Sequence, residues 1–400
     1  MAAEASVPPR SAPFAPPTLS LYLHTPFCQR KCPYCDFGSQ AFARIPEAAY
    51  AAAVGRELEV WRETLRDSRP LSSIFFGGGT PSLLAPETVA GWLDLIRRLW
   101  PLQPGCEITL EANPESATWD RLAGYRAAGV NRLSLGAQSL DKARLAGLER
   151  PHDVVGILRA VEAARRGGFS SIGLDLIYAT PGQRWKGWRR ELEAALALEP
   201  DHLSCYQLTV EEGTPLAARQ GRGTFTPLKP GRQAQLFQRT RAWLARRGFP
   251  PYEISNFAPP GRERRHNDLI WRYGDYLGVG AAAHGKWTVC GGARVEIRRS
   301  ANHRRVEDYL QAMARGEPPG ERWRVAPEEA AAECVILGLR RAAGMDRAEY
   351  ARWVGGDLLS RRGEEARRLR EVGWLEWNEA RIWIPEAGMV RADGIIARLA

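Results

Sequence analysis

Three cysteines within eight residues constrain this chain more than any other feature. Cys28, Cys32 and Cys35 have the spacing C-x3-C-x2-C inside the stretch LYLHTPFCQRKCPYCDFGS. Thiolates are soft metal ligands, so this spacing indicates a metal site before a disulfide framework. No fourth Cys or His follows at the spacing of a closed zinc site. A [4Fe–4S] cluster held by three cysteines would leave one iron open to a small ligand.

Composition narrows the class of protein. The 400 residues are 44% hydrophobic, which suits a globular chain of two or three domains, and the net charge is +10. The basic residues are mostly arginines scattered over amphipathic stretches, which favours a solvated surface over binding to nucleic acid, anionic lipid or a propionate-bearing porphyrin. No apolar run reaches the ~18 residues that span a bilayer. Seven cysteines without a secretory signal predict the cytoplasm, with peripheral contact at the inner face of the membrane left open.

Short apolar runs alternate with amphipathic stretches over the first half of the chain. Strands are expected at 19–24, 72–76, 107–111, 132–136, 171–177 and 202–208, and helices at 46–67, 86–99, 117–128, 152–167 and 186–198. This alternation predicts a parallel sheet with right-handed crossovers. Six units predict an α/β fold, a partial (β/α)6 barrel open on one side. Function in such barrels lies at the C-terminal ends of the strands.

Glycine and polar residues gather at these predicted strand ends. They are Gly77, Gly78, Gly79 and Thr80 after the second strand, Glu111 after the third, Gln138 after the fourth, Asp175 in the fifth and Tyr206 in the sixth. If this rim had only a structural role, it would need turn residues but no acidic or amide side chains at successive strand ends. Glycines without Cβ atoms would also let the backbone approach a ligand. The pattern therefore predicts one binding site at this rim.

The cysteine motif and its flanks, YLHTPFC and CPYCDF, resemble the signature of radical S-adenosylmethionine (SAM) proteins. The resemblance spans about residues 19–400. Within the superfamily, the flanks are most similar to the branch of anaerobic coproporphyrinogen III oxidases and HemW-like heme chaperones. It implies a [4Fe–4S] cluster whose open iron binds SAM, with the protein orienting the cofactor. The oxidases typically have a further cysteine, C-x3-C-x2-C-x-C. Phe37 stands at that position here, which favours the chaperone branch.

The resemblance also implies roles for individual residues. The cluster would be held by Cys28, Cys32 and Cys35, and SAM would be contacted by Tyr22, Gly77, Gly78, Thr80, Glu111, Gln138, Arg150 and Asp175. The alternatives are a buried core tyrosine for Tyr22 and ordinary rim ion pairs for the charged residues. His24 is expected to order the cysteine loop through a backbone hydrogen bond or to shield the cluster.

A histidine motif lies in the second half of the chain. His266 opens HNDLIW, which resembles the HNxxYW motif of the heme chaperones and implies that His266 binds heme, with Ile270 replacing the family tyrosine. Arg265 precedes it where many members have a Cys-Arg pair. A core or capping histidine is the alternative, and His284 is a second candidate ligand. The small residues of 274–285 would let the backbone pack on a flat ligand or on a neighbouring element.

Four regions are expected along the chain. They are a disordered tail at 1–18, a barrel at 19–215, an extension at 216–320 and a C-terminal domain at 321–400. In the extension, 233–247 is predicted as a helix, 252–258 as an extended segment and 287–320 as irregular. The C-terminal helices and the hairpin within 373–384 predict a winged-helix-like domain. It shows no helix with base-reading side chains, so a lid or docking surface over the barrel opening is favoured over nucleic-acid binding. The isolated cysteines Cys106, Cys205, Cys290 and Cys334 are expected in or near the core.

Three functions remain to be distinguished. The favoured one is a heme chaperone that binds a [4Fe–4S] cluster, SAM and heme, and delivers heme to an acceptor such as a membrane-bound respiratory hemoprotein. The second is oxidative decarboxylation of coproporphyrinogen III through a 5′-deoxyadenosyl radical, which Phe37 and the HNDLIW stretch oppose. The third is radical modification of tRNA, for which no added RNA-binding module is present. Whether SAM is cleaved stays open.

Overall fold

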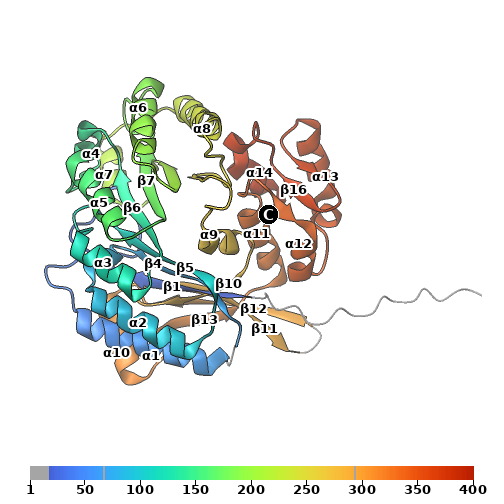
Figure 1. Cartoon of the computed structure of the whole chain (residues 1–400). Helices are drawn as coiled ribbons and strands as arrows, with labels where there is room; N and C mark the ends of the chain where they lie inside the picture. The colour runs from blue at the N-terminus through green and yellow to red at the C-terminus, as the bar shows by residue number, and fades with distance from the viewer. Residues whose placement is uncertain (1–17, 66–67, 292–293) are drawn as a thin grey trace, which may run out of the picture.

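The computed structural model describes residues 18–65, 68–291 and 294–400, without the side chains of 290–295 (Figure 1). The predicted tail, apart from Thr18, and the side chain of Cys290 therefore lie outside the described part. The six predicted strands are present as β1 (Leu19–Thr25), β4 (Leu71–Gly78), β5 (Leu102–Ala112), β6 (Arg132–Gln138), β7 (Ile172–Tyr178) and β8 (His202–Gln207). They pair in parallel in the order β1-β4-β5-β6-β7-β8. The predicted α/β class and the partial barrel are confirmed.

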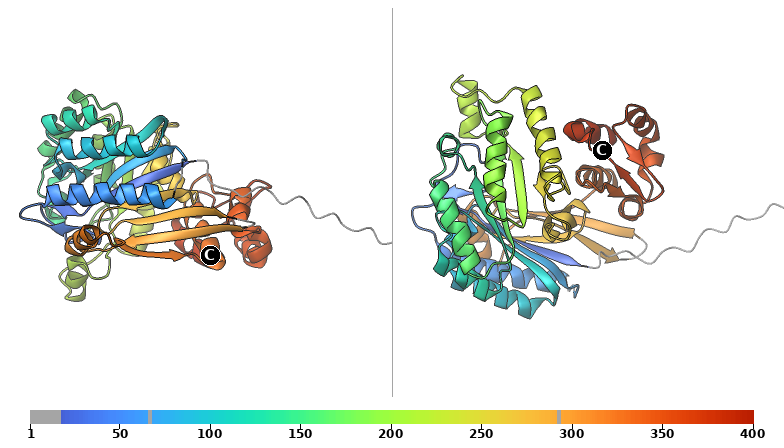
Figure 2. Two further views of the ribbon diagram at one scale, coloured as in Figure 1. Left: turned by 90° about the horizontal axis from the view of Figure 1, so that it is seen from below. Right: turned by 45° about the horizontal axis from the view of Figure 1, so that its top comes forward.

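Amphipathic helices cover the outer face of these strands (Figures 1 and 2). They are α1 (Glu47–Leu65), α2 (Pro86–Leu99), α3 (Trp119–Ala128), α4 (Lys142–Gly147), α5 (Val154–Arg166) and α6 (Trp185–Leu196). Pro86 starts α2 at a position where its missing N–H costs nothing. Asp153 caps α5 by accepting a hydrogen bond from the Gly156 amide at 2.8 Å. Buried side chains on their inner faces, such as Leu93 and Ile157, join one continuous core with the sheet.

The extension completes the sheet on both edges. β10 (Asp275–Val279) pairs in parallel with β1, and β11 (His284–Gly291), β12 (Arg294–Asn302) and β13 (Gly320–Arg324) follow antiparallel. At the other edge, β9 (Asn256–Phe257) pairs antiparallel with β8. The helices are α7 (Pro215–Gly221), α8 (Pro230–Ala245), α9 (Arg265–Trp271) and α10 (Val306–Arg315).

The prediction that 287–320 is irregular is wrong. Trp287 and Val289 lie on one face of a long hairpin and Ile297 on the other, and each face also contains arginines, Arg298 and Arg299 respectively. Because apolar and charged residues share both faces, the strand pattern was hidden in the sequence. The extended segment predicted at 252–258 contains strand only at Asn256–Phe257. Small residues around Gly278 serve a neighbouring element: a Cβ on Gly278 would lie 2.0 Å from the His284 carbonyl oxygen.

The C-terminal region forms a second hydrophobic core. Its elements are α11 (Pro327–Gly338), β14 (Met345–Asp346), α12 (Arg347–Val354), α13 (Leu358–Glu371), β15 (Glu376–Trp377), β16 (Arg381–Trp383) and α14 (Ala392–Leu399), with the three strands in one small sheet. This order is that of a winged helix. Tyr273 and Ile297 of the extension pack into the same core. Arg241 of α8, buried, holds Glu386 with two contacts of 2.7 Å.

We predict that Gly278→Ala lowers the free energy of unfolding by about 2–3 kcal/mol, because the new methyl group would overlap the β11 backbone. Urea unfolding of the full chain measures this. Gly91→Ala is the matched control, since Gly91 is exposed on α2 and a Cβ there would meet nothing within 4 Å, and it should raise stability by up to ~1 kcal/mol. Equal stability of the two variants would contradict the close approach of β10 and β11.

Candidate functional site

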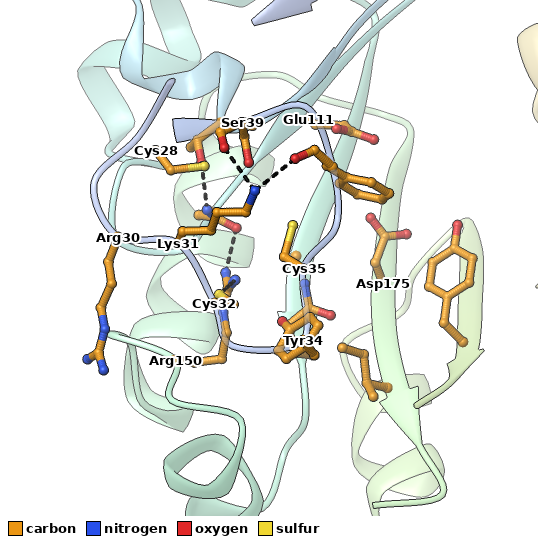
Figure 3. A pocket seen from close by; sticks show the side chains of 18 of the residues that line it. Cys28, Arg30, Lys31, Cys32, Tyr34, Cys35, Ser39, Glu111, Arg150 and Asp175 are labelled. Carbon is orange, nitrogen blue, oxygen red and sulfur yellow. Dashed lines mark hydrogen bonds between the residues drawn. The ribbon is translucent and has the colours of Figure 1, made fainter. Parts of the chain in front are cut away.

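A cavity of about 520 Å³ lies at the C-terminal ends of the barrel strands (Figure 3). We call it the cluster cavity. Of the predicted site residues, it is lined by Cys28, Cys32, Cys35, Thr80, Glu111, Gln138, Arg150 and Asp175. The barrel therefore brings together side chains that are up to 147 positions apart, because parallel strands end at one rim.

The cysteine loop is closed by hydrogen bonds to its own backbone. Lys31 Nζ donates to the carbonyl oxygens of Phe37 at 3.1 Å and Ser39 at 3.0 Å. The short strands β2 (Phe27–Cys28) and β3 (Gln40–Ala41) pair in parallel and close the base of the loop. The loop is thereby fixed at both ends, which lowers the entropy cost of presenting three thiols to one ligand.

His24 fastens the same loop to β1. Burial lowers the pKa of His24 to about 4, so the ring is neutral at physiological pH. Its Nε2 lies 3.1 Å from the Gly38 carbonyl oxygen, which can only accept, and its Nδ1 lies 3.0 Å from the Tyr22 hydroxyl. The neutral ring therefore donates from Nε2 and accepts at Nδ1. The predicted loop-ordering role of His24 is confirmed.

The three thiols lie in different surroundings. Cys32 is buried, and its Sγ accepts a hydrogen bond from Arg150 Nη1 at 3.1 Å, while Arg150 Nη2 donates to Asn113 Oδ1 at 2.6 Å. Cys28 Sγ lies 3.8 Å from Thr80 Oγ1. Burial raises the pKa of the Cys35 thiol, and the neighbouring Cys28 and Cys32 add to the rise, although a hydrogen bond with the Phe37 backbone and the charge of Lys31 oppose it.

Within the residues that the structure describes, no group of three Cys, His, Asp or Glu side chains converges on a single ion position. In an iron–sulfur cluster, each thiolate binds a different iron. All three cysteines are unpaired thiols that line one cavity. The donor set thus fits a [4Fe–4S] cluster with one iron left without a protein ligand.

The glycine run packs more tightly than the sequence suggested. A Cβ on Gly78, where φ is +110°, would lie 2.6 Å from the His24 ring, and one on Gly79 would lie 2.5 Å from the Phe27 carbonyl oxygen. The amides are already used: Gly78 donates to Glu111, Gly79 to Thr25 and Thr80 to Phe27. Gly79 and Thr80 line the cluster cavity, whereas Gly77 and Gly78 do not. These glycines fit β4 against the β1 loop instead of offering free amides to a ligand.

Two carboxylates form the floor of the cavity. Asp175 accepts from Ser134 Oγ at 2.5 Å and from Arg264 Nη2 at 3.2 Å. Burial raises the pKa of Glu111 to about 7, and the neighbouring charge of Asp175 adds to the rise, although Arg264 and the Gly78 amide oppose it. Arg264 is buried, and these acidic partners raise its pKa against the effect of burial. Two partly buried carboxylates therefore lie side by side here, with the buried Arg264 guanidinium next to Asp175.

Two strand ends adopt left-handed backbone conformations. Gln138 has φ of +64° at an irregularity of β6, and Ala179 has φ of +62° directly after β7. Residues other than glycine in this region cost of order 1 kcal/mol or more, and they cluster at functional sites. The strain at Gln138 turns its side chain into the cavity, where it was predicted to lie.

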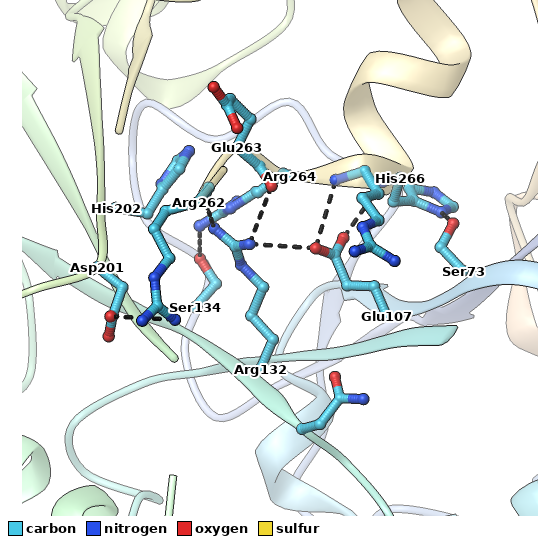
Figure 4. A network of polar contacts seen from close by, with 12 residues as sticks. Ser73, Glu107, Arg132, Ser134, Asp201, His202, Arg262, Glu263, Arg264 and His266 are labelled. Atoms are coloured by element: carbon cyan, nitrogen blue, oxygen red, sulfur yellow. Dashed lines mark hydrogen bonds and ion pairs between the residues drawn. The ribbon is translucent and has the colours of Figure 1, made fainter. Parts of the chain in front are cut away.

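Tyr22 and His266 do not line the cluster cavity. His266 lies beside Ser73 and Glu107 (Figure 4). Tyr22 stacks on Phe75, and His266 stacks on the same ring from a centroid distance of 5.0 Å. His266 is 2% exposed, with Nδ1 2.9 Å from Ser73 Oγ. Burial lowers its pKa to about 3, so the ring is neutral. His266 does not line the cluster cavity, its Nε2 is buried without a hydrogen-bond partner, and its role as a heme ligand stays a prediction.

The sequence missed several side chains of this site. They are Arg264, Ser134, Asn113 and Lys31, which complete its contacts, whereas Tyr206, which was expected at this rim, is 41% exposed and lines the cavity. Asn113 follows a strand end, so its position could have indicated it. Arg264 could not have been found in this way, since it comes from the segment before α9 and reaches Asp175 across 89 positions.

A partial barrel whose strand ends hold C-x3-C-x2-C beside two carboxylates is the arrangement of a radical SAM protein, and the radical SAM superfamily model matches residues 22–195. Relatives extend the similarity to nearly the whole chain. It is 33% identical to the heme chaperone HemW of Mycobacterium tuberculosis (98% of this chain, 97% of the relative) and 38% to HemW of Escherichia coli (74% and 76%). It is 34% identical to the mitochondrial radical S-adenosyl methionine domain-containing protein 1 of Bos taurus (95% and 87%). The chain belongs to the HemW family of the radical SAM superfamily.

The fold has a counterpart among solved structures. Coproporphyrinogen III oxidase HemN from Escherichia coli superposes with a TM-score of 0.78 at 23% identity, covering 96% of this chain and 90% of that one. The match includes the C-terminal region, so the predicted combination of partial barrel and small C-terminal domain is confirmed. At this identity the likeness concerns the fold.

We predict that the stability of the protein depends on pH through Glu111. A carboxyl whose pKa is raised on folding binds more protons in the folded state, so the free energy of unfolding falls as pH rises from the unfolded pKa of 4.5 to about 7. In Glu111→Gln, the free energy of unfolding should decrease by up to ~3 kcal/mol less than in wild type over this pH range. Urea unfolding of both proteins at about pH 5 and pH 8 measures the difference.

Glu115→Gln provides a control of opposite sign. Burial raises the pKa of Glu115, but the hydrogen bond from His152 and the charge of Arg150 outweigh it, and the net pKa is lowered. A lowered pKa contributes stability above the unfolded pKa, so this variant should lose stability at neutral pH. The same pH dependence in wild type and Glu111→Gln would show that Glu111 titrates normally.

Proposed function

We propose that this protein is a heme chaperone that holds a [4Fe–4S] cluster and SAM in the cluster cavity and passes heme to an acceptor hemoprotein. The observation that supports this most is the similarity to relatives named heme chaperone HemW, at 33% identity over 94–98% of this chain and at 39% identity over 74% of it. The cofactors are inferred from the superfamily and from the donor set of the cavity.

Cys28, Cys32 and Cys35 would each ligate one iron, and the cluster would supply one-electron chemistry to SAM at the iron left open. Arg150 holds Cys32 Sγ and places a positive charge where negative charge collects on the sulfurs. Lys31 and His24 keep the loop closed, so the thiols need no rearrangement. These contacts preorganise the site, which favours binding.

SAM carries a net positive charge, and the cavity is acidic. Of the described lining residues, five are acidic (Asp36, Glu111, Glu115, Asp175 and Glu211) and three are basic (Arg30, Lys31 and Arg150), a formal net charge of −2. Glu111 and Asp175 would face the cationic groups of SAM, with Gln138 and Thr80 beside them, and Arg150 its carboxylate. Tyr22, Gly77 and Gly78 would support these residues from behind, because they position His24 and the end of β4.

The acceptor and the location belong to the same proposal. We place the protein in the cytoplasm, where it would meet a respiratory hemoprotein by peripheral contact at the membrane. Among the described residues, no helix is both long and apolar enough to cross a bilayer. Phe37, 61% exposed at the cavity mouth, occupies the position of the further cysteine of the oxidases. A tRNA substrate has no support from any element described above.

We predict that Cys28→Ser, Cys32→Ser and Cys35→Ser each lose the cluster. Wild type purified without oxygen should hold about four irons and four sulfides per chain and show broad visible absorption. Each variant should lose most of both, while Cys106→Ala, a cysteine outside the cavity, should keep them. Full iron and sulfide content in one of these variants would show that the substituted cysteine is not a ligand of the cluster.

An anaerobic turnover assay separates chaperone from oxidase. Reconstituted protein with SAM, reductant and coproporphyrinogen III should form no protoporphyrinogen, because the further cysteine is replaced by Phe37. The same tube is scored for 5′-deoxyadenosine, which reports on the cluster, and a parallel titration with heme should show saturable binding. Formation of protoporphyrinogen would make the protein an oxidase.

A further inference from the structure

The exposed surface of two helices, α6 and α8, carries most of the net positive charge of the chain. The helices lie side by side, and Trp188 Nε1 of α6 donates to Thr240 Oγ1 of α8 at 2.7 Å (Figure 1). Four exposed basic residues in 184–196 and five in 229–247 are opposed by one exposed acid, Glu193, a formal net charge of +8. The whole chain has +10. We call the exposed side of these two segments the α6–α8 face.

Acidic residues do not offset this charge along the chain. Between Glu212 and Glu253 the sequence has eight basic residues and no acidic one. In α8 the basic residues alternate with apolar ones such as Leu236 and Leu244, which are buried in the core, so the exposed side of the helix is left basic. These arginines are scattered in the sequence, and the packing of α8 beside α6 collects them on one face.

A groove of about 430 Å³ runs between the two helices. Trp185 and Arg189 line it from α6, and Arg239, Ala242 and Arg246 line it from α8 and its C-terminal end. The last three positions are spaced three and four residues apart, so they share one side of the helix. Three guanidinium groups therefore gather around one open groove.

The guanidinium groups of this groove are positioned but not neutralised. Arg189 pairs with Glu193 at 3.3 Å, and this is the one ion pair that the described exposed basic residues of the α6–α8 face form. The pair is exposed, so it contributes little to stability and can open. Arg239 lies 6.0 Å from the ring centroid of Trp185. A cation–π contact of this kind orients a guanidinium group and leaves its N–H groups for anionic oxygens.

We propose that the α6–α8 face is the surface through which the protein contacts an anionic membrane, with its arginines on lipid phosphate groups; this inference rests on the peripheral membrane location in the proposed function. Guanidinium groups bind phosphate oxygens through paired N–H donors. Each basic side chain near an anionic bilayer adds to the attraction. Tryptophan, with an apolar ring and a polar N–H, suits the headgroup level of a bilayer, and Trp185 is partly exposed in the groove.

Among its described residues, the groove lacks the features that bind RNA or protein. Single-stranded RNA is held by aromatic rings whose faces are free to stack on bases. Trp243 is 5% exposed, with Arg247 3.5 Å from its ring centroid, and Trp185 lies beside Arg239. Protein interfaces have cores that are depleted of charged residues, whereas this face is charged along both helices. A plane of phosphate groups therefore matches it best.

Contact through this face would orient the rest of the molecule. None of the described residues that line the cluster cavity belongs to α6 or α8, so the membrane contact uses none of the cofactor-binding residues. Arg241, on the buried side of α8, holds Glu386 of the C-terminal domain. A membrane-bound α8 would therefore fix both the barrel and the C-terminal domain relative to the bilayer.

Co-sedimentation with lipid vesicles tests the face. The full chain with its cluster should bind vesicles of phosphatidylcholine with about 30% phosphatidylglycerol and should not bind phosphatidylcholine alone. Raising the salt from about 0.1 M to about 0.5 M should release it. The groove variant, Arg239→Glu with Arg246→Glu, should bind the anionic vesicles at least about 25-fold more weakly, because each basic residue near the surface contributes about five-fold.

Arg56→Glu with Arg98→Glu is the matched control. It changes the net charge by the same amount, and both arginines are exposed on α1 and α2, on the far side of the barrel from α6 and α8 (Figure 1). Its affinity for the anionic vesicles should stay within about three-fold of wild type. Iron content and urea unfolding of both variants should stay close to wild type, because all four side chains are exposed.

Each other outcome overturns a distinct part. If the control loses as much vesicle binding as the groove variant, net charge and not this face attracts the protein, and the proposal is wrong while the peripheral location stands. If the groove variant binds like wild type, another surface makes the contact. If wild type binds neither vesicle, the face and the location both fail, and iron content and heme titration still decide the chaperone function. If wild type binds tRNA instead of vesicles and the groove variant does not, the face binds nucleic acid.

Discussion

The position of β1 in the sheet is the constraint on which the site depends. β1 is hydrogen-bonded in parallel to β4 on one side and to β10 on the other, so the strand that leads into the cysteine loop is held along both edges. His24 at its end then ties Gly38 back to the sheet. Because the strand and the loop are fixed before any ligand binds, the thiols are presented at a constant place in the cavity that Glu111 and Asp175 also line. The glycines at the end of β4 are needed for this fit, since a side chain there would strike His24 or the Phe27 backbone.

Acidic and basic side chains are concentrated at opposite ends of the barrel. The C-terminal ends of the strands gather carboxylates and thiols, and the N-terminal ends, together with the C-terminal domain, gather arginines. The overall charge of +10 gave no indication of this division. Arg264 lies between the two ends, beside Asp175, and it lines a second cavity at the N-terminal ends of the strands while it donates to Ser134 and Asp175 of the cluster cavity.

The C-terminal domain acquires a role from this geometry. A lid over the barrel opening was expected, yet no described residue beyond Glu211 lines the cluster cavity. The domain instead borders a second cavity, of about 1090 Å³, with α12 and with the segment after α11, and it is fastened to the barrel by Arg241 on Glu386 and Arg341 on Asp268. Ion pairs of this kind fix orientation more than they add stability.

The sequence by itself determined the class of fold, the cysteine site and the family. Period-two and period-3.6 patterns are local, so the strands and helices of the barrel could be read within a few residues, and the C-x3-C-x2-C spacing specifies its chemistry without a fold. Glu111, Gln138 and Asp175 were predictable because parallel strands bring their ends to one rim. The tertiary structure alone decided that β10 joins the barrel at β1, that Arg264 lies beneath Asp175 and that His266 is sealed behind Phe75. Each of these depends on contacts between segments 89 or more positions apart, for which a single sequence contains no periodic signal.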